Sequence, residues 1–139
     1  MTPNELANLH AAAFSATRAW SADEFAGLLQ HPGTFAIGDT HCFALIRTVL
    51  DEAELLTIAT APAMRRQGLA RATLLAGEAR AKTEGAARIF LEVAEDNGAA
   101  IKLYTSSGYH QIGRRPGYYL PKDGAPLAAL VMRKSLTTT

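Results

Sequence analysis

The pattern of apolar and polar positions predicts two helices at the start of the chain, over residues 3–16 and from about Ser21 to Gln30. In the first, apolar residues recur every three or four positions, which places one stripe along the helix: Leu6, Leu9 and Ala13. The second starts with a serine that has a glutamate three residues later, the arrangement of a capping box. The chain is therefore expected to begin with two helices, the second ending before Pro32.

From residue 34 the pattern changes to short runs rich in β-branched and aromatic residues, which indicate strands. The runs at 34–38 and 42–50 are separated by Gly38-Asp39-Thr40-His41, which is typical of a turn, so a hairpin is expected. Further strands are expected at residues 54–61, 87–94, 109–114 and 127–133.

Two more helices are expected between these strands, a long one over residues 68–84 and a short one from the N-cap Asn97 to Gly108. We assign the long helix an apolar stripe of Leu69, Ala72, Ala76 and Ala79, and a solvent stripe that includes Arg71, Glu78 and Lys82. The strand–helix–strand unit over 54–94 predicts two parallel neighbouring strands, joined by a right-handed crossover. The other strands are expected to be antiparallel, which makes the fold class α/β.

Length and composition fit one globular domain, expected over residues 1–136 and followed by a frayed tail at 137–139. Of the 139 residues, 48% are hydrophobic and 19% charged, and the net charge is +1. Such a balance gives no strong field for nucleic acid or a membrane surface, and neither partner is expected. No apolar run reaches the roughly 18 residues of a spanning helix, and the first residues lack the features of a signal peptide.

Cysteine and histidine usage argues against a metal site. Cys42 is the single cysteine, which excludes an intrachain disulfide and a multi-cysteine cluster and favours a reducing, cytoplasmic location. We expect Cys42 to be a small core residue rather than a nucleophile. The histidines have no metal-ligand spacing, and we interpret all of them as surface or packing residues: His10, His31, His41 and His110.

A candidate anion-binding segment lies between a predicted strand and the start of the long helix: Arg65-Arg66-Gln67-Gly68-Leu69-Ala70. The first turn of a helix has free N–H groups and partial positive charge, which a pyrophosphate can use. Gly68 permits close approach of the backbone, and Arg65, Arg66 and Arg71 would add mobile positive charge. The same residues also fit an ordinary solvated helix start. The missing Lys-Ser/Thr ending argues against a nucleoside triphosphatase.

Two polar side chains in apolar surroundings are candidates for proton transfer. Glu92 interrupts an apolar strand, so it is either a base in a half-buried site or a residue of the solvent face. Tyr104 lies seven residues after Asn97, on the same face of the short helix. Its hydroxyl is either a proton donor or the polar end of a packing aromatic, and spacing alone leaves both interpretations open.

Together these segments resemble the GNAT superfamily of N-acetyltransferases over nearly the whole chain, from about Leu6 to Leu136. The resemblance rests on two signatures, Arg65-x-x-Gly68-x-Ala70 and Asn97-x-x-Ala100-x-x-Leu103-Tyr104-x-x-x-Gly108-Tyr109. A narrower resemblance is to the bacterial ribosomal-protein-alanine N-acetyltransferases. It is carried by Leu50 to Leu55, Leu91-Glu92-Val93, Trp20-Ser21, Tyr118-Tyr119 and Asp123-Gly124. It implies a mixed, mostly antiparallel sheet with a splayed parallel strand pair, flanked by helices.

The resemblance also implies a chemistry, with acetyl-CoA as the donor, Glu92 as the base and Tyr104 as the acid that protonates the leaving thiolate. The implied coenzyme contacts are Ile58, Ala59, Thr60, Arg65, Arg66, Gln67, Gly68, Leu69, Ala70, Arg71 and Asn97. No metal is implied.

The implied acceptor is the N-terminal alanine of a small-subunit ribosomal protein, attacked directly in a ternary complex. Trp20 and Tyr118-Tyr119 are candidates for the acceptor groove, although packing alone also explains Trp20. An extra Pro-Gly in the segment 114–117 is expected to reshape this groove. The alternatives are a GNAT enzyme acting on a small amine or a lysine side chain, and an acyl-CoA-binding module without turnover.

Overall fold

Six strands form one mixed sheet in the spatial order β1-β2-β3-β4-β6-β5. The computed structural model describes residues 1–14, 19–119 and 124–137. The described helices are α1 (Pro3–Ala13), α2 (Ala22–Leu29), α3 (Leu69–Thr83) and α4 (Gly98–Ser106), with a 3₁₀ turn at Pro62–Met64. The strands are β1 (Thr34–Gly38), β2 (Cys42–Val49), β3 (Glu52–Thr60), β4 (Arg88–Ala94), β5 (His110–Tyr119) and β6 (Leu127–Ser135). The predicted order of elements is confirmed.

Two predicted boundaries are wrong by more than two residues. The first helix ends at Ala13, and Phe14 already leaves the helical conformation with a φ of −116°. Residues 15 and 16, also assigned to this helix, lie outside the described residues. β5 continues to Tyr119 instead of ending at residue 114. Pro116 is tolerated within it because β5 is an edge strand, where a missing N–H costs no ladder hydrogen bond on the free side.

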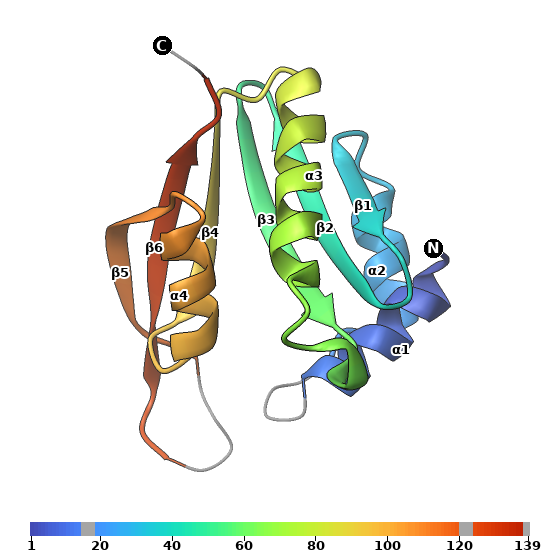
Figure 1. The fold of residues 1–139 in the computed structure, drawn as a ribbon, viewed down its shortest axis with the longest axis horizontal. Helices are drawn as coiled ribbons and strands as arrows, with labels where there is room; N and C mark the ends of the chain where they lie inside the picture. The colour runs from blue at the N-terminus through green and yellow to red at the C-terminus, as the bar shows by residue number, and fades with distance from the viewer. Residues whose placement is uncertain (15–18, 120–123, 138–139) are drawn as a thin grey trace.

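Helices cover both faces of the sheet, with α3 and α4 on one face and α1 and α2 on the other (Figure 1). The core under α3 and α4 includes Leu74, Ile89 and Leu91. The core under α1 and α2 is built around Leu6, Phe25 and Phe43. Side chains alternate along a strand. The β4 residues that flank Leu91 therefore point away from the core under α3 and α4, to the face of α1 and α2.

β3 and β4 are the parallel pair, as predicted, but they are paired over a short length. Their register runs from Glu52 opposite Arg88 to Glu54 opposite Phe90. Beyond this point β3 continues to Thr60 and β4 to Ala94 without pairing to each other, and the two strands diverge (Figure 1). The expected splayed strand pair is thus present.

The buried face of α3 differs from the predicted stripe. Its buried residues are Leu74, Gly77, Glu78 and Ala81, whereas Ala72, Ala76 and Ala79 are exposed. A Cβ at Gly77 would clash with the Ile46 side chain, which fits a glycine in the packed face. No helix of the described residues is long and apolar enough to cross a bilayer.

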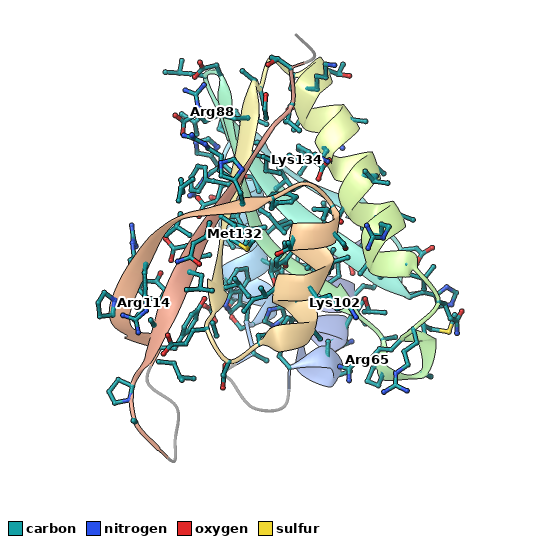
Figure 2. The ribbon with its side chains drawn as sticks, turned by 60° about the vertical axis from the view of Figure 1, so that its left-hand side comes forward. Arg65, Arg88, Lys102, Arg114, Met132 and Lys134 are labelled. Carbon is teal, nitrogen blue, oxygen red and sulfur yellow. The ribbon has the colours of Figure 1, made fainter. Side chains whose placement is uncertain are left out.

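Glu78 can lie in the core because two partners compensate its burial. Lys134 Nζ on β6 lies 2.6 Å from Glu78 Oε1, and the Tyr109 hydroxyl donates to Glu78 Oε2 at 2.8 Å. In register, Lys134 is opposite Ile89 of β4, so its side chain crosses that strand to reach α3; Figure 2 shows it on the side of the sheet that α3 covers. This buried group therefore ties α3 to β6 on the far side of the diverging strands.

Candidate active site

The divergence of β3 and β4 leaves one edge of β3 without a strand partner. Ile58, Ala59 and Thr60 pair with β2 on one side, opposite Ala44, Phe43 and Cys42. On the side of β4 they pair with none of the described strands. N–H and C=O groups on that free edge can therefore bond an extended ligand arm. The structure thus places the three predicted backbone contacts at the opening between the strands.

The segment before α3 makes two turns that expose the start of the helix. Arg66 and Gly68 both have positive φ, 63° and 77°, and Gly68 is the N-cap. No side chain of the described residues caps this helix, so the N–H groups of Leu69, Ala70 and Arg71 keep their hydrogen-bonding capacity for a ligand. A non-glycine residue held at positive φ, next to an uncapped helix start, fits an anion-binding turn.

The expectation that all three candidate arginines are mobile is wrong for two of them, because other parts of the protein hold their side chains. Arg65 Nη2 donates to the Ala13 carbonyl at the end of α1, at 2.9 Å. Figure 2 shows Arg65 in the loop that precedes α3. Arg71 donates to Ser106 and Ser107 at the end of α4. Arg66 is exposed and has no partner among the described residues, so its charge is the free one in this loop.

Glu92 lies on β4 and points to the face of α1 and α2, because Leu91 and Val93 on either side of it belong to the opposite core. Its side chain is 17% exposed, and Oε1 lies 3.1 Å from Arg115 Nη1. The alternative that Glu92 is a residue of the solvent face is thus wrong. Glu92 is half-buried where β3 and β4 diverge, and it is ion-paired.

Tyr104 reaches the same region from the other face of the sheet. It is buried in α4, 6% exposed, and its ring centroid lies 5.7 Å from that of Tyr109. Burial raises the pKa of Tyr104 well above its ordinary value, and the nearby Tyr119 adds to this. The phenol therefore stays protonated at neutral pH. Its hydroxyl makes no hydrogen bond within the described part of the chain, so it can donate to a ligand.

Tyr119 connects the two candidate proton-transfer groups. It is half-buried, and its pKa is raised by burial first and by the Glu92 carboxylate second. Its electrostatic contact with Tyr104 completes a cluster that draws on β4, α4 and β5. Tyr119 is among the acceptor contacts that the sequence predicts, whereas Arg115 is not. The sequence shows only a basic pair, Arg114-Arg115, before Pro116-Gly117, and nothing in that pair indicates a contact with Glu92.

A bulge in β5 aims this cluster at the divergence. In register, Arg115 is opposite Ala129 and Tyr119 is opposite Leu127, so three β5 residues face one β6 residue. Gly117, within the bulge, has a φ of 65°. The Pro-Gly pair therefore lies within this bulge, and its effect on the acceptor groove stays a prediction.

The remaining candidates have local roles. Asn97 Oδ1 accepts from the Ala100 N–H at 3.2 Å, which confirms the cap of α4. Trp20 packs with His10 and Phe25 in the core under α1 and α2, which favours packing over a groove contact. Cys42 is buried, with Sγ 3.3 Å from Thr60 Oγ1. Of the other histidines, His31, His41 and His110 are exposed. Within the described ranges no three His, Cys, Asp or Glu residues group as metal ligands.

A mixed sheet opened between its parallel strands, with a helix that begins beside the opening, is the arrangement of the GNAT fold. Residues 7–109 match the model of the acetyltransferase (GNAT) family, and the chain belongs to this family. The family uses acetyl-CoA.

Among its relatives are the [ribosomal protein bS18]-alanine N-acetyltransferases. That of Haemophilus ducreyi is 40% identical over 90 residues, which are 65% of this chain and 62% of that protein. That of Escherichia coli K12 is 42% identical over 87 residues, which are 63% of this chain and 59% of that protein. The matches thus span less than two thirds of these relatives. The crystal structure of the Escherichia coli ribosomal-protein-S18-alanine N-acetyltransferase superposes with a TM-score of 0.88 at 32% identity, covering 99% of this chain and 89% of that chain.

Proposed function

We propose that this chain transfers the acetyl group of acetyl-CoA to the α-amine of a protein N-terminus, by direct attack in a ternary complex. The acceptor we favour is the N-terminal alanine of a small-subunit ribosomal protein, as in the relatives' names. This acceptor puts the reaction in the cytoplasm. The observation that carries the proposal is that Glu92 and Tyr104 approach the diverging strands from opposite faces of one sheet.

The donor side of the site fits a pyrophosphate and an extended arm. The uncapped N–H groups at the start of α3 suit the pyrophosphate, and Arg66 supplies a charge that no described residue neutralises. The free edge of β3 suits the amide-containing arm that follows. Bound acetyl-CoA supplies the acetyl group as a thioester.

The acceptor side needs a group that takes a proton from an ammonium. Glu92 points to the face of α1 and α2, so an amine that enters from that face meets its carboxylate. Oε1 is held by Arg115, whereas Oε2 has no hydrogen-bond or ion-pair partner among the described residues, so it is the oxygen we assign to the amine. A positioned base of this kind contributes about 10²–10⁴ in rate.

The leaving sulfur needs a proton as the amine replaces it. Tyr104 lies on the α4 side of the sheet, and burial keeps its hydroxyl protonated at neutral pH. The group therefore has a proton to give and no competing partner among the described residues. We assign it as the general acid.

The chemistry favours an α-amine over a lysine side chain. An N-terminal amine has a pKa of about 7.7–8.0 and a lysine side chain about 10.4, so near neutral pH the α-amine is roughly a few hundred times richer in its neutral form. One carboxylate base suits the easier amine. An acceptor with a small first residue is expected, because a bulky one would crowd the diverging strands.

The proposal is tested with acetyl-CoA and synthetic peptides, following free thiol release and locating the acetyl group by mass spectrometry. The set contains a peptide beginning with Ala, the same peptide beginning with Leu, an α-blocked version that keeps its lysines, and a polyamine as a small amine. We expect the Ala peptide to react fastest and the blocked one to be inert. Fast acetylation of the blocked peptide would overturn the N-terminal assignment, and acetyl-CoA binding without thiol release from any amine would favour the binding module.

A further inference from the structure

We propose that Arg115 is a positioning residue for Glu92, holding Oε1 of the carboxylate so that Oε2 faces the acceptor amine. This inference rests on the proposed function, since it assigns Glu92 as the base. The contact is the ion pair between Arg115 Nη1 and Glu92 Oε1, at 3.1 Å. It joins a strand of the splayed pair to the edge strand of the sheet, two strands away.

Arg115 is the cation in contact with Glu92 among the described residues. The other ionisable neighbours are phenols: Tyr119 from β5 interacts with the carboxylate, and Tyr104 from α4 interacts with Tyr119. From β6, the residue opposite Glu92 is Val131. Among these neighbours, the guanidinium of Arg115 is the one that makes an ion pair with the carboxylate. We therefore assign it as the group that fixes the side-chain orientation of Glu92.

The geometry of β5 places Arg115 for this contact. The bulge after it sets three residues against one on β6, and the Tyr118 ring lies 5.5 Å from the guanidinium carbon. Cation–π contact with this ring limits where the guanidinium can move. The preceding Arg114 pairs instead with Glu95, at 2.9 Å. The two neighbouring arginines thus hold two different glutamates, and Arg114 provides a matched control.

Holding one oxygen has a direct consequence for proton transfer. The guanidinium keeps its charge throughout, so it continues to hold Oε1 while Oε2 accepts the proton. Without Arg115 the carboxylate can rotate away from the amine, and loss of alignment in a reacting pair is costly even for displacements of about 1 Å. The expected loss is in turnover rather than in donor binding.

The test compares Arg115→Gln, Arg115→Lys and Arg114→Gln, each assayed with the best amine acceptor of the peptide and amine set. We expect Arg115→Gln to lower kcat by about tenfold or more, with KM for acetyl-CoA and the thermal unfolding midpoint unchanged. Arg115→Lys should recover part of the loss, since it restores the charge but not the planar fork. Arg114→Gln should stay within about twofold of the unsubstituted protein, because its partner Glu95 has no assigned part in proton transfer.

A double-mutant cycle with Glu92→Gln separates positioning from a structural role. If Arg115 acts through Glu92, its substitution costs nothing further once Glu92 is replaced, so the double variant is as slow as Glu92→Gln alone. Losses that add in the double variant would overturn the proposal, as would equal effects of Arg115→Gln and Arg114→Gln. A different best acceptor would correct the proposed function and leave this test valid, whereas a protein that acetylates no amine would overturn both.

Discussion

Arg71 in the first turn of α3 donates from Nη2 to Ser106 Oγ in the last turn of α4, at 2.5 Å. A second bond runs from Arg71 Nη1 to Ser107 Oγ at 3.1 Å. The two helices flank the diverging strands, so this contact joins the two halves of the fold across the opening (Figure 1). The Arg71 guanidinium is thus already engaged, whereas the exposed Arg66 has no partner among the described residues.

This difference predicts unequal roles in donor binding. We expect Arg66→Gln to weaken coenzyme A binding several-fold and to make the affinity less dependent on salt, because a free cation beside the pyrophosphate is lost. Arg71→Gln should weaken binding less, since its bonds to Ser106 and Ser107 would have to break before it met a phosphate. Calorimetric titration at two salt concentrations measures both. A larger loss for Arg71→Gln would show that Arg71 changes partners when the coenzyme binds.

The turn before α3 gives a second prediction, with a control at the other end of the same helix. Gly68 and Gly85 have φ values of 77° and 103°, and no atom lies within 4 Å of an added Cβ at either. Valine at either position therefore strains the backbone without a clash, at a cost of about 1–2 kcal/mol. We expect Gly68→Val and Gly85→Val to lower stability alike, and only Gly68→Val to weaken coenzyme A binding more than tenfold. Equal affinities would remove the loop from the donor site.

The third prediction separates two neighbouring phenols. Tyr104→Phe removes a hydroxyl that has no partner among the described residues, so stability should hold. We expect kcat to fall by about 10²-fold or more, with coenzyme A binding little changed. An acyl donor with a more acidic leaving thiol should lose less, because it needs less help from a proton donor. Equal losses for both donors would indicate a packing role for Tyr104.

Tyr109→Phe is the matched control for this pair. The Tyr109 hydroxyl donates to Glu78, so its removal leaves a buried carboxylate with one fewer donor. We expect a loss of about 1–3 kcal/mol in stability, measured by denaturant unfolding, with kcat nearly unchanged. If Tyr109→Phe lowered kcat as much as Tyr104→Phe, both hydroxyls would affect the rate through packing, and Tyr104 would not be the general acid.

Much of the fold was predictable because its signals are local. The caps at Ser21 and Asn97 are set by residues three positions apart, and both are present. The hairpin between β1 and β2 follows from the turn at 38–41, where Asp39 accepts from the N–H groups of His41 and Cys42. The crossover rule then fixes the parallel pair, and the sequence signatures locate the opening between its strands.

The wrong or missing predictions of side-chain environment concern residues whose partners are far away in the sequence. Glu78 reads as a solvent-facing residue because its partners, Tyr109 and Lys134, come 31 and 56 residues later. Arg115 gave no local signal of its contact with Glu92, since the β5 bulge that aims it depends on pairing with β6. Likewise, the free charge of Arg66 could not be told from that of Arg71 before the ends of α3 and α4 were placed together. Charge partners across a sheet are set by topology, which sequence periodicity does not encode.

The last prediction concerns acid stability and begins at His10. This side chain is buried, and its Nδ1 accepts from the Trp20 backbone N–H at 3.1 Å. Its ring stacks on Trp20 at 5.0 Å and lies 4.5 Å from that of Phe14. Burial lowers the pKa of His10 below its ordinary value, with Glu24 opposing this more weakly. An accepting Nδ1 also requires that atom to be unprotonated, so the native state holds His10 neutral.

The sign of the effect follows from proton uptake. Below the ordinary pKa of about 6.5 the unfolded chain binds a proton at His10, whereas the folded protein does not until a lower pH. The unfolded state thus binds more protons in that window, so the free energy of unfolding falls as pH drops from about 6.5. His10→Asn keeps an acceptor but cannot titrate, and we expect it to reduce the loss between pH 7.5 and 5.5 in urea unfolding. His110→Asn, at an exposed position, should leave the pH dependence as it is. If His10→Asn and the unsubstituted protein lose stability equally over this range, His10 does not couple folding to pH.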